Sequence, residues 1–351
     1  MGPGVVTVFG GSGFVGRYVV QALARQGARV RVVCRRTEEA LVCKPMGDVG
    51  QIVPVAANIR DEASIAAALQ GSDAVVNRIG ILYERGRQTF DAVHRQGAGA
   101  IAREAARAGV RQFVQISAIG ADSGSDSAYA RSKGLGEAAV RDAFPGAVIL
   151  RPSIVFGPED DFFNRFAAMA RLAPALPLIG GGHTRFQPVY VCDLAAAVAR
   201  TLSDASCAGR TFELGGPRIH SFKELLETML AVIDRKRLLV PVPFWLATAQ
   251  AAVIEWALAV PAMILPAFVP APPITRDQVR LLRHDNVVAE GADGFAALGI
   301  EPTGLDVILP TYLVRWPATG SRFRSVSGRR RRACSSAVAA SPSSPRWRSW
   351  R

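Results

Sequence analysis

The sequence of 351 residues predicts an α/β fold, a doubly wound parallel sheet with a smaller, partly helical C-terminal lobe. Three observations lead to this prediction. A strand–turn–helix–strand unit built on a glycine cluster opens the chain, strands and helices then alternate to about residue 150, and the alternation loosens after Pro152. Parallel strands that neighbour each other need a crossover of about a dozen residues or more, and the helices between the strands supply it.

The elements of the first half follow from hydrophobic spacing. Residues 5–9 form a β-branched run, residues 14–26 repeat apolar positions at helical spacing, and residues 29–34 alternate as a strand does. Helices between parallel strands cover both faces of a sheet. The remaining strands are expected near 52–55, 73–77, 111–116 and 147–150, and the helices that join them at 61–70, 88–108 and 127–143.

The second half is less regular because Pro and Gly become frequent. A strand is expected at 188–191, and helices at 193–202, 221–234 and 244–258. We divide the chain into a first domain at 1–215, a C-terminal lobe for substrate or partner at 216–320, and a tail at 321–351. The tail is rich in Arg and Ser and unpatterned, which predicts disorder.

Residues 238–273 carry a single charge, Glu255, but seven prolines interrupt them. Only 244–260 is unbroken, which is short for a membrane span. Two interpretations stay open for this segment. It forms a core helix of the second lobe, or an amphipathic element that lies on a membrane or a partner.

The net charge of +13 is concentrated at the C-terminal end, where residues 321–351 hold nine Arg and no acid. Without these nine, 33 basic residues face 29 acidic ones, so a nucleic-acid partner is not favoured. Arg outnumbers Lys by 38 to four, as a GC-rich gene would produce. We take the residues from about 320 as a frameshift product or an idiosyncratic extension.

Cysteine and histidine placement argues against metal and disulfide sites. The five Cys are scattered without a C-x-x-C pair, and the four His are far apart, so no metal ligands are predicted. The chain enters a strand pattern by Val5 without a basic segment and a cleavage site before it. These features lead us to expect a cytoplasmic protein, peripheral at most on the inner membrane.

The glycine cluster stands between the first predicted strand and the first predicted helix. Glycines at 10, 13 and 16 allow a tight turn, close approach of a diphosphate and close packing of helix on strand. The helix N-terminus favours the same anion through its free N–H groups. This context predicts a dinucleotide loop made of Gly10, Ser12, Gly13, Phe14, Val15 and Gly16.

Two arginines stand about 20 residues after the loop, where a site that prefers NAD carries an acid. Arg35 and Arg36 directly follow the second strand. Because guanidinium groups suit a 2′-phosphate, NADP(H) is predicted in preference to NAD(H). If both arginines are merely solvated, this preference is lost and NAD(H) is the alternative.

Tyr129 and Lys133 lie four residues apart in a predicted helix and therefore share one face. An ammonium group beside a phenol lowers the pKa of the phenol, and it can also hold a ribose. The pair suits acid–base chemistry at a carbinol or carbonyl carbon. Ser117 ends the preceding strand, where its hydroxyl can donate to the substrate oxygen.

Taken together, these motifs resemble the short-chain dehydrogenase/reductase superfamily, whose Rossmann domain would occupy 1–215 as an NAD(P)-binding unit. The resemblance spans nearly all of 1–315, through the segments G-G-S-G-F-V-G (10–16), N-R-I-G (77–80), Y-A-R-S-K (129–133), R-P-S-I-V-F-G-P (151–158) and P-V-Y-V-C-D-L-A (188–195). The last two, with D-D-F-F-N-R-F (160–166) and L-G-I-E-P-T (298–303), are similar to the NDUFA9-like group of the NAD(P)-dependent epimerase/dehydratase family. That group is named for the 39-kDa accessory subunit of respiratory complex I.

The resemblance implies further cofactor contacts. Asn58 and Ile59 would lie against the adenine, Asn77 to Gly80 would line the cofactor, Tyr129 and Lys133 would contact the nicotinamide ribose, and Pro152 with Ser153 would close over the nicotinamide. Two positions depart from the family pattern. Asn58 stands where Asp is common, and His94 stands where extended enzymes carry an Asn, which puts a proton relay in question.

The resemblance favours one function and leaves others open. NDUFA9-like relatives hold NADPH as a structural element, so we expect an NADP(H)-binding protein associated with complex I subunits, a membrane surface or quinone metabolism. The alternative is a soluble NAD(P)-dependent reductase or epimerase that acts on a small carbonyl or sugar-nucleotide substrate through Tyr129 and Lys133. A third, weaker interpretation is a protein that binds nucleic acid through the tail.

Overall fold

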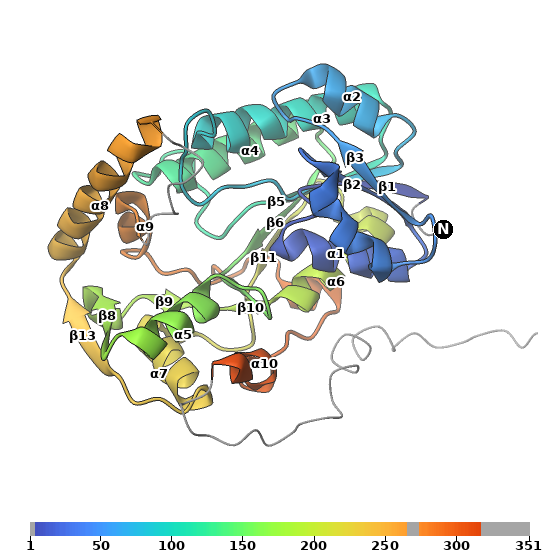
Figure 1. Cartoon of the computed structure of the whole chain (residues 1–351). Helices are drawn as coiled ribbons and strands as arrows, with labels where there is room; N and C mark the ends of the chain where they lie inside the picture. Colours follow the sequence, from blue (N-terminus) through green and yellow to red (C-terminus); the bar gives the residue numbers. More distant parts are fainter. Residues whose placement is uncertain (1–3, 265–273, 317–351) are drawn as a thin grey trace, which may run out of the picture.

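The computed structural model describes residues 4–264 and 274–316, and Figure 1 shows a central sheet between two layers of helices, with a second lobe beside it. The sheet has seven strands in the order β11-β6-β5-β4-β1-β2-β3, all paired in parallel. Its strands are β1 (Val5–Phe9), β2 (Arg29–Cys34), β3 (Ile52–Ala56), β4 (Ala74–Asn77), β5 (Gln112–Ile116), β6 (Val148–Pro152) and β11 (Thr211–Leu214). The predicted doubly wound fold is confirmed.

Helices cover both faces of this sheet (Figure 1). One face carries α2 (Glu62–Leu69), α3 (Ala98–Arg107) and α4 (Ala128–Ala143), and the other carries α1 (Phe14–Arg25) and α6 (Val191–Ser203). The strand order reverses between β1 and β4, which is the point where ligands bind in doubly wound sheets, at the carboxyl ends of the strands.

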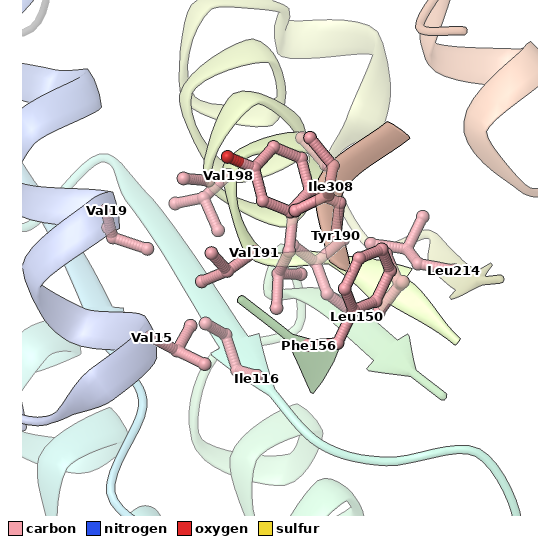
Figure 2. Close-up of a cluster of buried hydrophobic side chains, with 14 of the residues drawn as sticks. Val15, Val19, Ile116, Leu150, Phe156, Tyr190, Val191, Val198, Leu214 and Ile308 are labelled. Atoms are coloured by element: carbon pink, nitrogen blue, oxygen red, sulfur yellow. The ribbon is translucent and has the colours of Figure 1, made fainter. Parts of the chain in front are cut away.

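Successive residues of the central strands point into two separate hydrophobic cores, as strand geometry requires. In β5, Val114 and Ile116 belong to the core beneath α1 and α6, whereas Phe113 belongs to the core beneath α3 and α4. Figure 2 shows the first of these cores, with Val15 and Val19 of α1 and Ile116 of β5 among its side chains. Burial on both faces explains why these strands read as continuous apolar runs.

The structure refines the predicted elements at a few places. The helix expected at 88–108 begins with a π-helical segment, Asp91–Gly97, before α3. β11 lies at the sheet edge beside β6, although the sequence analysis placed no strand there. The tail predicted at 321–351 lies outside the described residues.

The second lobe combines segments from both sides of β11. β8 (Ala175–Ile179) pairs in parallel with β13 (Leu238–Val242), and short pairs join β7 (Val155–Phe156) to β10 (Val189–Tyr190) and β9 (Arg185–Phe186) to β12 (His220–Ser221). Its helices are α5 (Phe162–Leu172), α7 (Phe222–Val232), α8 (Phe244–Ile264), α9 (Arg276–Leu281) and α10 (Leu305–Tyr312). The lobe is therefore partly helical, as predicted.

The apolar segment that begins at Leu238 supplies β13 and α8. Ala247 and Ala251 of α8 are buried and pack with Ile179, whereas Trp245 and Trp256 are 71% and 72% exposed. One face of α8 thus belongs to a small core and the other faces outward. Among the described residues, no helix is long and apolar enough to cross a membrane.

Candidate functional site

The glycine loop connects β1 to α1 with the backbone geometry that the sequence predicts. Gly10 has a φ of +76°, which favours glycine. A Cβ on Gly16 would lie 2.2 Å from the carbonyl oxygen of Gly10, so only glycine allows this contact between helix and loop. No side chain caps the start of α1 at Gly13. The first N–H groups of α1, in Phe14, Val15 and the adjoining residues, are therefore available to an anion such as a diphosphate.

The predicted acid–base residues gather at the carboxyl ends of β4, β5 and β6. Lys133 is 8% exposed, and its Nζ lies 5.8 Å from the ring centroid of Tyr129. A Cβ on Gly80 would lie 3.2 Å from that Nζ, so the glycine leaves room for the ammonium. Ser117 follows β5, and its buried hydroxyl has no hydrogen-bond partner among the described residues. Such a hydroxyl is free to donate to a bound molecule.

Two neighbouring residues complete this edge of the sheet. Asn77 is buried at the end of β4, donates to Gln115 Oε1 at 2.9 Å and accepts from the backbone N–H of Ile79 at 3.1 Å. The amide thus holds the backbone of the following segment, which runs to Gly80. Pro152 is buried at the end of β6.

Burial is the largest cause of the pKa shifts of both Tyr129 and Lys133. Burial raises the pKa of Tyr129 to about 12, and the opposing cation is the guanidinium of Arg78. Burial, followed by repulsion from Arg78, lowers the pKa of Lys133 to about 8, while Glu137 raises it. The expected lowering of the phenol pKa by Lys133 does not occur in this arrangement, because desolvation of the phenolate dominates.

His94, where the resemblance leads us to expect an Asn, lies in the π-helical segment Asp91–Gly97 before α3. Burial lowers its pKa to about 2, so the ring is neutral near pH 7. The backbone N–H of Ile81 donates to Nε2 at 3.0 Å, so the ring proton is on Nδ1, 2.8 Å from Ser132 Oγ. Ser132 in turn donates to the carbonyl oxygen of Tyr129 at 2.8 Å. Both ring nitrogens are thereby engaged, and His94 holds the helix of Tyr129 in place.

The residues predicted to contact the adenosine part of the cofactor follow β2 and β3. Arg35 and Arg36 are both exposed, and Arg36 Nε donates to Glu39 at 2.8 Å. Sequence reasoning did not consider this carboxylate, which forms an ion pair with the guanidinium of Arg36. Asn58 uses its side-chain oxygen to accept from the backbone N–H of Arg60 at 3.2 Å.

Ile59, predicted beside the adenine, packs against the π-helical segment. A Cβ on Gly97 would lie 2.7 Å from Ile59 Cδ1. The glycine therefore lets the segment after β3 approach the start of α3 closely.

The sequence analysis gave no separate role to two residues of this site, although Arg78 lies within the stretch from Asn77 to Gly80 that it expected to line the cofactor. Arg78 follows Asn77, and a cation directly after a buried strand was a signal available in the sequence. Asp277, in α9, accepts hydrogen bonds from Ser127 Oγ and from the backbone N–H groups of Ala128 and Tyr129. No local sequence pattern indicates that contact, because about 150 residues separate its partners.

Comparison with known proteins identifies the family. The profile of the NAD dependent epimerase/dehydratase family matches residues 6–215. The chain belongs to this family. Within the NAD dependent epimerase/dehydratase family it falls in the NDUFA9-like group. It is 38% identical over 325 residues to the mitochondrial NADH dehydrogenase [ubiquinone] 1 alpha subcomplex subunit 9 of Arabidopsis thaliana, covering 92% of this chain and 80% of that protein.

Other similar proteins extend this comparison. The mouse subunit of the same name is 35% identical over 305 residues, covering 86% of this chain and 78% of that protein. The ceramide reductase of Caulobacter vibrioides is 34% identical over 193 residues, covering 55% and 59%. A Streptomyces venezuelae dTDP-glucose 4,6-dehydratase structure with NAD bound superposes with a TM-score of 0.67 at 21% identity, covering 89% and 96%. This last likeness concerns the fold.

The comparison corrects the expected location. The relatives aligned over most of this chain are mitochondrial proteins by name, which overturns the prediction of a cytoplasmic protein. That prediction depended on what the N-terminal residues lack, and the lack of one kind of targeting signal does not determine a compartment.

Proposed function

We propose that this protein binds a nicotinamide dinucleotide, with NADP(H) preferred, and associates with respiratory complex I, where the cofactor has mainly a structural role. The observation that carries the proposal is the identity of 33–38% to complex I subunits over more than four-fifths of this chain. The uncapped start of α1 and the glycine contacts beneath it fit a dinucleotide diphosphate.

The protonation of the site supports a structural cofactor. When bound, the nicotinamide would supply a hydride donor or acceptor. A phenol whose pKa is about 12 is a weak acid near pH 7, and the ring nitrogens of His94 are committed to Ile81 and Ser132. Reaching the phenolate form near pH 7 is therefore unfavourable for Tyr129, and His94 has no free ring nitrogen with which to relay a proton.

The NADP(H) preference depends on Arg35 and Arg36. Replacing both by Ala should weaken NADPH binding by about tenfold or more and leave NADH binding unchanged, since only the former carries a 2′-phosphate. Glu39→Gln is the matched control because it releases Arg36 from its carboxylate, and it should tighten NADPH binding. Equal affinities for both dinucleotides in all three proteins would contradict the preference.

A second function is favoured by the free hydroxyl of Ser117 and by the similarity to a ceramide reductase. In this alternative the protein reduces a small carbonyl, or epimerises a sugar nucleotide, with Ser117 donating to the substrate oxygen and Tyr129 exchanging the proton. Lys133 would hold the nicotinamide ribose. A role in quinone metabolism, expected above as part of the first function, would use the same chemistry with a quinone as the acceptor.

One set of measurements separates the two functions. Native mass spectrometry of the purified protein should find NADPH bound, and aldehydes, ketones, sugar nucleotides and a short-chain quinone should leave it unoxidised. On native gels of detergent-solubilised mitochondrial membranes, the protein should migrate with NADH dehydrogenase activity. Rapid NADPH oxidation by one substrate, abolished in Tyr129→Phe, would replace the first function with the second.

A further inference from the structure

Arg78 places a cation directly beside the glycine loop. Its backbone N–H donates to the carbonyl oxygen of Phe9 at 3.1 Å, which fixes the residue at the carboxyl end of β4 next to β1. A Cβ on Gly13 would lie 2.8 Å from Nη1 of Arg78. The guanidinium therefore lies against the residue that precedes α1, at the helix end that favours anions.

The charge of Arg78 has no counterion in the described part of the chain. Its side chain makes no ion pair or hydrogen bond with any of those residues, although it is half-buried. Burial lowers the pKa of the guanidinium, and the only group that opposes this is the phenol of Tyr129. The second cation nearby, Lys133, is repelled by Arg78. Arg78 thus has a neighbouring cation and no carboxylate partner, an arrangement that an anionic ligand would stabilise.

The position of Arg78 distinguishes between the anionic groups of a dinucleotide. Arg35 and Arg36 follow β2, whereas Gly13 stands at the start of α1. The 2′-phosphate belongs near the former and the diphosphate near the latter. The planar fork of a guanidinium pairs with phosphate oxygens in two parallel hydrogen bonds.

We propose that Arg78 is a cofactor-binding residue that pairs with the diphosphate of the bound dinucleotide and supplements the N–H groups of α1 with a full charge. This inference depends on the proposed dinucleotide binding. It implies that the ligand neutralises Arg78 and relieves its repulsion of Lys133. It also implies that NADPH and NADH use Arg78 equally, because both carry the diphosphate.

The test measures dissociation constants of NADPH, NADH and adenosine 2′-monophosphate by calorimetry at two salt concentrations. Arg78→Gln should bind both dinucleotides about 10- to 100-fold more weakly, with a salt dependence reduced by about one charge, and should bind adenosine 2′-monophosphate as the original chain does. Arg78→Lys keeps the charge without the planar geometry of the guanidinium, so its affinity for both dinucleotides should lie between those of the original chain and Arg78→Gln.

Arg29→Gln is the matched control, since the exposed Arg29 begins β2 at the opposite end of the sheet and should leave every affinity unchanged. Melting curves without ligand verify folding, and Arg78→Met replaces the Gln variant if that variant is unfolded.

The outcomes separate this inference from the proposed function. If the original chain binds neither dinucleotide, the proposed function is wrong and the role of Arg78 is overturned with it. If the original chain binds and Arg78→Gln binds equally well, only the role of Arg78 is overturned. A loss confined to NADPH and adenosine 2′-monophosphate would move Arg78 to the 2′-phosphate and overturn the assignment to the diphosphate.

Discussion

Replacing Asp277 should destabilise the helix that carries Tyr129. The half-buried carboxylate accepts from Ser127 Oγ at 2.9 Å, from Ala128 N at 2.8 Å and from Tyr129 N at 3.0 Å. Loss of a helix cap costs about 0.5–2 kcal/mol, and loss of an anion at a helix N-terminus costs about 0.3–1 kcal/mol. Asp277→Ala should therefore lower the free energy of unfolding by about 2 kcal/mol, and Asp277→Asn, which keeps one acceptor, by about 1 kcal/mol.

The measurement is urea unfolding followed by circular dichroism, with the midpoints compared at a common slope. Asp126→Ala is the control, because Asp126 is an exposed acid just before the same helix and no described hydrogen bond involves its side chain. A loss for Asp277→Ala no larger than that for Asp126→Ala would refute the reasoning. It would mean that Ser127, which also accepts from Ala130 N, caps the helix alone.

Three further substitutions probe other contacts. Between pH 6.5 and 5 the original chain should lose about 1.7 kcal/mol of stability in all relative to His94→Gln, because the unfolded state binds a proton that the folded His94 does not. Equal changes of stability in the two proteins, measured by urea titrations across this range, would contradict the reasoning. Gly16→Ala should cost about 1–3 kcal/mol and weaken NADPH binding in calorimetry, because its Cβ meets the oxygen of Gly10. Tyr312→Phe should cost about 1–2 kcal/mol in thermal unfolding, because the phenol donates to buried Asp160 at 2.5 Å; an unchanged melting temperature would show that the backbone donors to Asp160 suffice.

The core of the fold could be predicted from the sequence because its signals are local. Strands buried on both faces read as β-branched runs, and β1 and β2 have the predicted bounds. The lobe gave weaker signals. β8 and β13 contain Pro177 and Pro241, which argue against a central strand, yet a two-stranded sheet has free edges that tolerate them.

The residues of the site also differ in whether a local sequence motif indicates them. The glycine loop and the pair of Tyr129 and Lys133 are local motifs, so the sequence indicated them directly. Two contacts of the site have no such local signal. Asp277 meets Tyr129 N because two segments far apart in the sequence fold together, and Arg36 meets Glu39 because of the rotamers that the two side chains adopt. Arg78 lay inside a quoted motif, but its unpaired charge appears only when Gly13 and Lys133 are placed around it.

The parallel pairing of β8 with β13 also constrains how the chain acquires its structure during synthesis. About 60 residues separate the end of β8 from the end of β13, and β11, the edge strand of the main sheet, is made between them. At about 5–20 residues per second, β8 therefore waits roughly 3 to 12 seconds for its partner. During that interval Leu176 and Leu178, both buried in the finished protein, face water on a nascent chain. The strands of the main sheet are therefore complete before β13 is made, so this sheet can form first and the pairing of β8 with β13 follows.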